Sequence, residues 1–173
     1  MTIRNRREAV SIIARMAINQ HLIKNALMFF SKRELYFAYG SNMSSKHLIE
    51  RIPSAKVIGS AKLDGYIWCC NKLGKDGTAK ANLMRDAASS VHGVLFSIKT
   101  KHWKRLDQIE NGYRRISVEV DVHGEIKSAA TYQSELITNH APTESYVSFI
   151  IDGLIEHKLP EQYVREIRRE AGI

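Results

Sequence analysis

The sequence predicts an α+β fold in which a small, mixed and strongly bent β-sheet or barrel is flanked by helices. Two observations carry this prediction. Most of the stretch between residues 35 and 134 consists of apolar or alternating runs that are typical of strands. Helical patterns are fewer and scattered, near residues 46–51, 101–109 and 145–169. Strands interrupted by scattered helices are typical of the α+β class.

The first strand is expected at residues 35–39, Leu-Tyr-Phe-Ala-Tyr, which have no polar break and suit a buried strand. Gly40 then allows a sharp turn or a close approach to a ligand. Ser41, Asn42 and the serines after them favour a turn and a helix N-cap, and residues 46–51 can form that helix. Backbone N–H groups at such a turn would point into one space and could hold an anion or a developing oxyanion.

Two other interpretations of this turn stay open on spacing alone. It can be no more than a capped connection between a strand and a helix. It can also be the nucleophile turn of a hydrolase, but Met43 stands where the second glycine of that motif belongs. Ser41 is therefore a poor candidate nucleophile.

The remaining elements follow from the same patterns. Residues 71–90 are polar and rich in Gly and Ser, so we expect a surface excursion there with one short strand at 79–84. The other expected elements are β-prone runs between 55 and 70, a central strand at 92–98, a helix at 101–109, a hairpin of 113–122 with 126–134, a helix from about 145, and a last helix beginning at Pro160.

Composition excludes several classes of function. Of the net charge of +8, residues 1–33 carry +6, so the rest of the chain has no basic stripe for nucleic acid. No apolar run reaches the roughly 18 residues that a membrane span needs. The seven histidines show no metal-ligand spacing, so we expect no metal. The adjacent Cys69 and Cys70 suit neither a disulfide nor a shared metal site, which favours a reducing, cytoplasmic setting.

Two segments differ in character. Residues 1–33 are basic, poor in acidic residues and amphipathic, and we expect a helical extension that is dispensable for chemistry. A transit peptide, or a start of the protein at Met28, are the alternatives for this segment. Residues 34–173 are expected to form the functional domain.

A carboxylate in the segment 103–113 is the second candidate functional group. At about 100° per residue, Glu110 falls between Trp103 and Leu106 on the apolar face of the predicted helix. Burial would raise the pKa of this carboxyl group toward the range that is useful for proton transfer. The alternative is a helix that has already ended, with Glu110 in water. Asp107 is one turn away and is interpreted as structural, bonded to a backbone amide.

These segments resemble the γ-glutamylcyclotransferase family. Residues 39–43, Tyr-Gly-Ser-Asn-Met, after an aromatic strand, are similar to the family's distinctive motif. Leu106, Asp107 and Glu110 are similar to a second motif, followed by Tyr113, and a third similarity begins at Tyr146. Asn111 departs from the glycine that usually follows the glutamate. The resemblance extends from about residue 35 to 167.

The resemblance implies cleavage of a γ-glutamyl amide into 5-oxoproline and a free amine, without a cofactor and with Glu110 as the acid/base. The implied substrate-binding residues are Tyr39, Gly40, Ser41, Asn42, Met43, Tyr113 and Tyr146. The implied partner is a small γ-glutamyl compound, an amino acid or amine conjugate, with neither nucleic acid nor membrane, and a homodimer is left open. The alternative is a non-catalytic binding protein on the same scaffold, which would engage its partner through the basic N-terminal segment.

Overall fold

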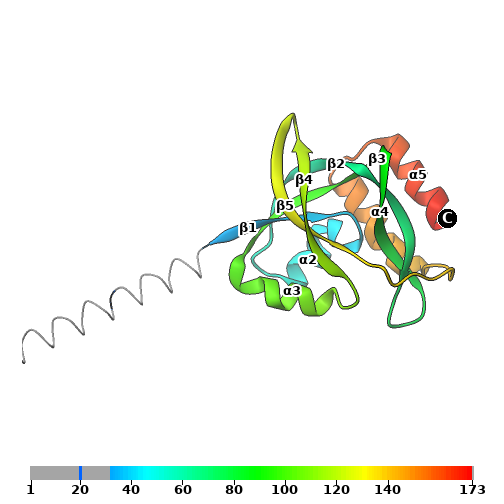
Figure 1. The fold of residues 1–173 in the computed structure, drawn as a ribbon, viewed down its shortest axis with the longest axis horizontal. Helices are drawn as coiled ribbons and strands as arrows, with labels where there is room; N and C mark the ends of the chain where they lie inside the picture. Colours follow the sequence, from blue (N-terminus) through cyan, green and yellow to red (C-terminus); the bar gives the residue numbers. More distant parts are fainter. Residues whose placement is uncertain (1–19, 21–31, 173) are drawn as a thin grey trace, which may run out of the picture. The chain divides into compact units, whose positions relative to one another are not determined.

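A closed five-stranded barrel forms the centre of the protein, with strand order β1-β3-β2-β4-β5 (Figure 1). The computed structural model describes Gln20 and residues 32–172, so the predicted N-terminal extension lies almost entirely outside the described residues. The strands are β1 (Arg33–Ala38), β2 (Lys56–Leu73), β3 (Ala79–Lys99), β4 (Arg114–Val122) and β5 (Glu125–Gln133). The predicted α+β class with a barrel is confirmed.

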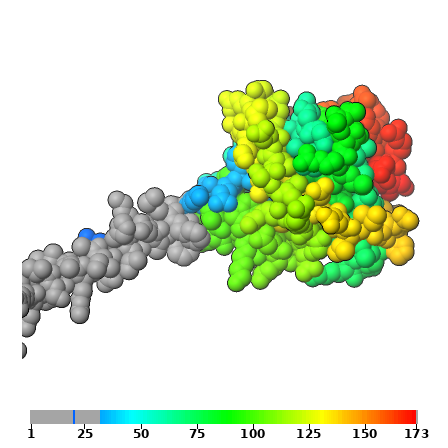
Figure 2. All heavy atoms as spheres, in the orientation of Figure 1, coloured from blue at the N-terminus to red at the C-terminus, as the bar shows by residue number. Residues whose placement is uncertain are grey.

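The sheet is mixed because one of its strand pairs is parallel. β1 pairs antiparallel with β3 and parallel with β5, where Tyr36 lies beside Ala130 and closes the barrel. β4 and β5 form the predicted hairpin, which stands out in yellow in Figures 1 and 2. β2 and β4 meet at a single pair, Lys62 with Asp121. The first strand, β1, is thus held between two others, with Phe37 and Ala38 fully buried.

The region 71–90 is a correction to the sequence analysis. Instead of a surface excursion with a short strand, it is the end of a long hairpin in which β2 and β3 pair from Lys56 with Ser97 to Leu73 with Ala79. The strands stay paired over this length because bulges near Val57, Asp64 and Cys70 bend them around the barrel. Gly65, at φ +78°, occupies one of these irregular positions.

Within residues 32–172, four α-helices and two 3₁₀ turns accompany the barrel. They are η1 (Ser41–Met43), α2 (Ser45–Arg51), η2 (Thr100–His102), α3 (Trp103–Ile109), α4 (Glu144–Glu156) and α5 (Glu161–Ala171). The Ser44 hydroxyl accepts from the amide of His47, which is the N-cap that the serines after Gly40 indicate. At the start of α4, the Thr143 hydroxyl accepts from the amide of Tyr146, a cap that the sequence analysis did not predict. Pro160 immediately precedes α5, whose inward face carries Tyr163 and Ile167.

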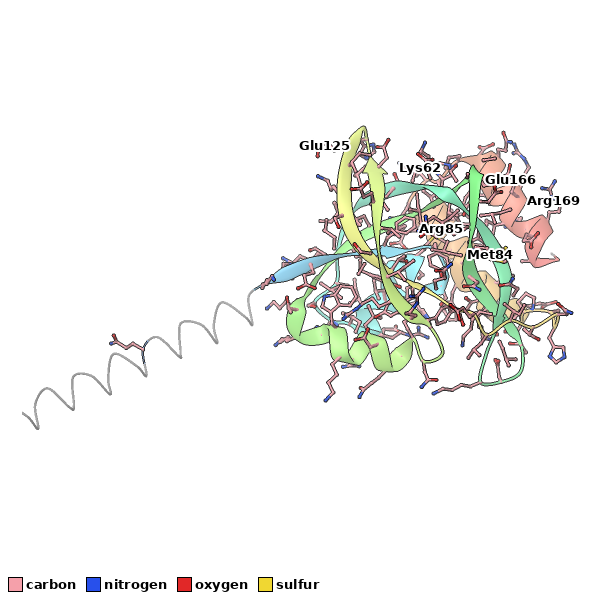
Figure 3. All side chains as sticks on the ribbon, in the orientation of Figure 1. Lys62, Met84, Arg85, Glu125, Glu166 and Arg169 are labelled. Carbon is pink, nitrogen blue, oxygen red and sulfur yellow. The ribbon has the colours of Figure 1, made fainter. Side chains whose placement is uncertain are left out.

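The core lies inside the barrel and under α4. The outer surfaces of the β4–β5 hairpin and of α5 carry charged side chains. Glu125 lies at the tip of the β4–β5 hairpin, and Glu166 and Arg169 lie on α5, as the labels in Figure 3 show. None of the described helices is both long and apolar enough to cross a membrane. The arrangement leaves one end of β1, with its turn η1, beside the end of α3 and the start of α4.

Candidate active site

Glu110 and Asn42 meet where the turn after β1 faces the end of α3. The side-chain amide of Asn42 donates to Glu110 Oε1 over 2.7 Å and to the Tyr36 hydroxyl over 3.0 Å. The Asn42 carbonyl oxygen accepts from Arg51 over 3.2 Å. Asn42 is only 4% exposed, so its orientation is fixed by these three bonds. The turn and the carboxylate that the sequence analysis singled out are therefore in direct contact.

The position of Glu110 follows from how α3 ends. Trp103 and Leu106 are buried and anchor the helix on the barrel. The helix ends at Ile109, and the Glu110 amide still bonds to the Leu106 carbonyl over 2.9 Å. A tight turn follows, in which the Tyr113 amide bonds to the Glu110 carbonyl and Gly112 adopts φ +84°. The alternative in which the helix has already ended is therefore right about the helix. Its second part is wrong, because the Glu110 carboxylate points to Asn42 rather than into water.

Burial is the largest influence on the Glu110 carboxyl group and raises its pKa above the ordinary value. Three groups act in the opposite direction and lower it: the positive charge of Arg51, the hydrogen bond from Asn42 and the positive charge of Lys72. Burial prevails in this balance. A carboxylate with a raised pKa can both accept and release a proton near neutral pH.

Five tyrosines surround this carboxylate: Tyr36, Tyr39, Tyr113, Tyr132 and Tyr146. Burial raises the pKa of each phenol, so all of them stay protonated at neutral pH. The backbone of Ala81 on β3 holds two of them: its amide donates to the Tyr146 hydroxyl over 2.8 Å, and its carbonyl accepts from the Tyr113 hydroxyl over 2.7 Å. The Tyr39 hydroxyl donates to the carbonyl of Tyr132. The rings are thus fixed before any ligand arrives.

The site consists of a small recess that opens into a larger cleft. The recess, of about 30 Å³, is lined by the five tyrosines with Gly40, Ser41, Asn42, Ala81 and Glu110. The cleft, of about 390 Å³, shares Ser41, Glu110, Tyr113 and Tyr146 with the recess and extends over basic side chains. Glu110 lies at the boundary between the two. A small molecule can therefore place its reacting atoms in the recess and the rest of its structure in the cleft.

Seven of the eight residues implied by the resemblance line this recess, and Met43 does not. Met43 is 1% exposed and packs into the core, and its amide is used within the turn, in a bond to the Gly40 carbonyl. Tyr113 lies in the recess, as the resemblance implies. Asp107 accepts from the Tyr132 hydroxyl over 2.7 Å and lies 3.5 Å from Arg115, so its partners are side chains rather than a backbone amide.

Sequence reasoning missed Tyr36, Tyr132, Arg51 and Lys72. Tyr36 lies in a strand whose apolar neighbours gave no hint that its hydroxyl reaches a polar group. Tyr132 and Lys72 come from strands β5 and β2 and meet the site through the barrel, whereas Arg51, on α2, reaches back to Asn42 in the preceding turn. Over the described part of the chain, no three His, Cys, Asp or Glu side chains form a group that could hold a metal ion.

Gly40 is required by close packing rather than by a left-handed backbone, because its φ is −119°. A Cβ there would lie 3.1 Å from the Ala81 side chain and 3.4 Å from the Tyr146 hydroxyl. We therefore expect Gly40→Val to displace the recess wall and lower kcat/KM at least about tenfold, more than Ser41→Ala, which removes only one hydroxyl. Steady-state kinetics of the two purified variants check this. A well-folded Ser41→Ala protein without activity, or a trapped acyl-serine, would contradict it.

Fold and site together define a small-molecule site: a closed barrel with one buried carboxylate at the inner end of a cleft. The comparisons with known proteins agree. The AIG2-like family model matches residues 90–167, which include Glu110. The chain is 28% identical to human gamma-glutamylcyclotransferase over 144 residues, 78% of this chain and 77% of the relative, and 27% identical to the bovine protein over similar shares, 77% and 76%.

Solved structures share the fold. A gamma-glutamyl cyclotransferase structure superimposes with a TM-score of 0.74 at 24% identity, covering 79% of this chain and 87% of the other. YkqA from Bacillus subtilis superimposes with a TM-score of 0.71 at 21% identity, covering 89% of this chain and 58% of the other. In sequence and in fold, the chain is thus similar to the γ-glutamylcyclotransferases and to the AIG2-like family.

Proposed function

We propose that this protein is a γ-glutamylcyclotransferase that converts a γ-glutamyl amino acid or γ-glutamyl amine into 5-oxoproline and the free amine. The single observation that carries the proposal is the Glu110 carboxylate, held by Asn42 over 2.7 Å at the boundary between a recess lined by tyrosines and an open cleft. The named activity of the human and bovine relatives supports it.

The reaction needs one proton carrier and little else. The substrate's own α-amine attacks its γ-carbonyl carbon, a new C–N bond closes a five-membered ring, and the original amide C–N bond breaks. Since nucleophile and carbonyl belong to one molecule, proximity is built in. Glu110 takes a proton from the α-ammonium group, which frees the nucleophile, and gives it to the departing nitrogen as the amide C–N bond breaks. The second proton, lost by the ring nitrogen when the new C–N bond forms, passes to the released amine, which leaves as an ammonium ion. The raised pKa of Glu110 suits both of its steps.

Two phenol hydroxyls are suited to stabilise the oxyanion. The Tyr36 oxygen accepts from Asn42 and the Tyr146 oxygen accepts from the Ala81 amide, so each keeps its own hydrogen for another acceptor. The Tyr146 hydroxyl is also hydrogen-bonded to the Ser41 side chain, whose hydroxyl can either donate or accept. Directed into the recess, both would donate to the negative oxygen of the tetrahedral intermediate. The backbone amides of Ser41 and Asn42 would hold the substrate's α-carboxylate.

No cofactor takes part in this proposal, since the ring closure involves no change of oxidation state and the hydroxyls supply the electrophilic assistance. Both cysteines are free thiols, which fits a reducing compartment such as the cytoplasm. The 5-oxoproline product would link the protein to the metabolism of γ-glutamyl compounds, of which glutathione is one. A folded domain for residues 34–173, with residues 1–33 as a dispensable extension, remains part of the proposal.

The rival is a binding protein that keeps the scaffold without the chemistry. A proton carrier needs a carboxylate whose pKa is raised, as burial raises that of Glu110, whereas a binding site has no need of the raised pKa, so Glu110 favours the enzyme. The test is a panel of γ-glutamyl amino acids, γ-glutamyl amines and glutathione, scored by release of 5-oxoproline. We expect turnover of at least one compound, unaffected by EDTA. Binding of these compounds with no 5-oxoproline from any of them would favour the binding protein.

A further inference from the structure

Lys72, at the end of β2, is a buried lysine in the wall of the cleft. Its residue is 5% exposed, and its Nζ donates to the Asn111 carbonyl over 3.2 Å and lies 4.7 Å above the ring centre of Tyr113. Gly112 makes room for it, because a Cβ at that glycine would come within 3.1 Å of Nζ. The ammonium group is thus held in one place by a carbonyl, a ring and a close backbone approach.

The charge of Lys72 has no carboxylate partner, in contrast to that of its neighbour. Lys72 and Lys80 lie directly opposite each other in the β2–β3 ladder. Lys80 is neutralised by Asp76, at 2.9 Å, and also donates to the Thr78 hydroxyl over 2.6 Å. Within residues 32–172, no carboxylate lies within 4 Å of the Lys72 ammonium group.

A buried ammonium group opposite a second lysine is costly unless an anion joins it. Burial, and the charge of Lys80, lower the pKa of Lys72, while Glu110 raises it. The cost is offset when a carboxylate enters the cleft and pairs with the ammonium group. The cleft therefore contains a cationic position that the protein itself leaves unpaired.

The location of Lys72 decides which carboxylate it can meet. Its hydrogen-bond partner, Asn111, directly follows Glu110 in the chain, and Lys72 lines the cleft but not the recess. In a γ-glutamyl amino acid, the leaving nitrogen and the carboxylate of the leaving amino acid are attached to the same carbon. With that nitrogen at Glu110 and the ring-forming atoms in the recess, the carboxylate of the leaving amino acid would lie in the cleft, whose wall includes Lys72.

We propose that Lys72 is a specificity-determining residue that binds the carboxylate of the leaving amino acid, so that γ-glutamyl amino acids are preferred over γ-glutamyl amines. The inference rests on the proposed function and adds the substrate class. It also predicts that the enzyme distinguishes two substrates that differ in one group. The preferred substrate, γ-glutamyl-alanine, carries the carboxylate, and γ-glutamyl-ethylamine has hydrogen in its place.

The test compares these two substrates in wild type, Lys72→Met and Lys104→Met. We expect Lys72→Met to lower kcat/KM for γ-glutamyl-alanine about 10- to 100-fold, mainly through KM, and for γ-glutamyl-ethylamine less than about threefold. Lys104 is exposed on α3 and lines neither the recess nor the cleft, so Lys104→Met removes an equal charge and should change either value less than about twofold. Lys72→Arg should keep part of the preference.

Equal losses for both substrates would overturn the proposal, because Lys72 would then act on the γ-glutamyl part or on the turn that carries Glu110. A wild-type protein without a preference for γ-glutamyl-alanine would overturn it as well. Calorimetric binding of both compounds to Glu110→Gln protein, with and without Lys72→Met, gives a readout that needs no turnover. A binding preference that depends on Lys72, in a wild-type protein that releases no 5-oxoproline, would support the subsite and refute the proposed activity.

Discussion

Glu110→Gln is expected to lower kcat by about 10²–10⁴-fold while binding of γ-glutamyl compounds is retained. The substituted side chain keeps the length of glutamate and an oxygen that can accept from Asn42, at 2.7 Å in the wild type. It cannot carry a proton from one nitrogen to another. The measurement is 5-oxoproline release under saturating substrate, together with calorimetric binding of the same compound.

The same substitution is expected to stabilise the fold at neutral pH. Because the folded-state pKa of Glu110 is raised, its protonated form is favoured in the folded protein, and ionisation costs stability as the pH rises through that value. The neutral amide avoids this cost. The gain in unfolding free energy should therefore be largest above the raised pKa and disappear below the ordinary value of 4.5. Denaturant unfolding at several pH values measures it.

The activity of the wild type should show the same ionisation. As the pH falls through the raised pKa, Glu110 becomes protonated and can no longer accept the proton of the ammonium group. The acid limb of kcat/KM is thus expected above pH 4.5, displaced in the direction of the raised pKa. Glu119, exposed on β4, provides the matched control, and Glu119→Gln should leave rate and pH profile unchanged. A Glu110→Gln enzyme with near-normal kcat would show that another group carries the proton.

The features predicted correctly from the sequence are those that depend on neighbours along the chain. The run from Leu35 to Tyr39, the turn at Gly40 and the cap at Ser44 are fixed by local preferences, and the β4–β5 hairpin is local too. The inward position of Glu110 follows from its spacing to Trp103 and Leu106, even though the helix ends one residue earlier.

The features that were missed depend on contacts between distant segments. The stretch 71–90 has the composition of a loop, but pairing of β2 with β3 keeps it extended. Arg51 reaches the site through Asn42, and Lys72 through the turn after Glu110, which no local pattern reveals. The direction of the Tyr36 hydroxyl depends on an amide six residues away that folds back onto it. The β2–β3 pairing and the contact of Lys72 depend on how the barrel closes, whereas the contacts of Arg51 and Tyr36 depend on how the turn η1 folds back. Periodicity reveals neither.

Gly153→Ala is expected to destabilise the protein by about 1–3 kcal/mol, against the preference of helices for alanine. Gly153 lies inside α4, where replacing glycine by alanine ordinarily gains about 1 kcal/mol. Here a Cβ would meet the Met43 Cβ at 2.5 Å and the backbone of Met43 and Ser44 at 2.6 Å. Since backbone atoms cannot rotate away, either α4 or the turn η1 must move.

That displacement also reaches the site, because α4 carries Tyr146 and η1 carries Ser41 and Asn42. We therefore expect Gly153→Ala to lower kcat/KM as well as the melting temperature, although no atom of Gly153 lines the recess. Ser148→Ala, on the exposed side of the same helix, is the matched control and should shift stability by no more than about 0.5 kcal/mol. Thermal unfolding and kinetics of the two variants show whether Gly153→Ala lowers or raises the stability and the activity. A Gly153→Ala protein that gains about 1 kcal/mol with normal activity would mean that helix preference outweighs the contact with η1.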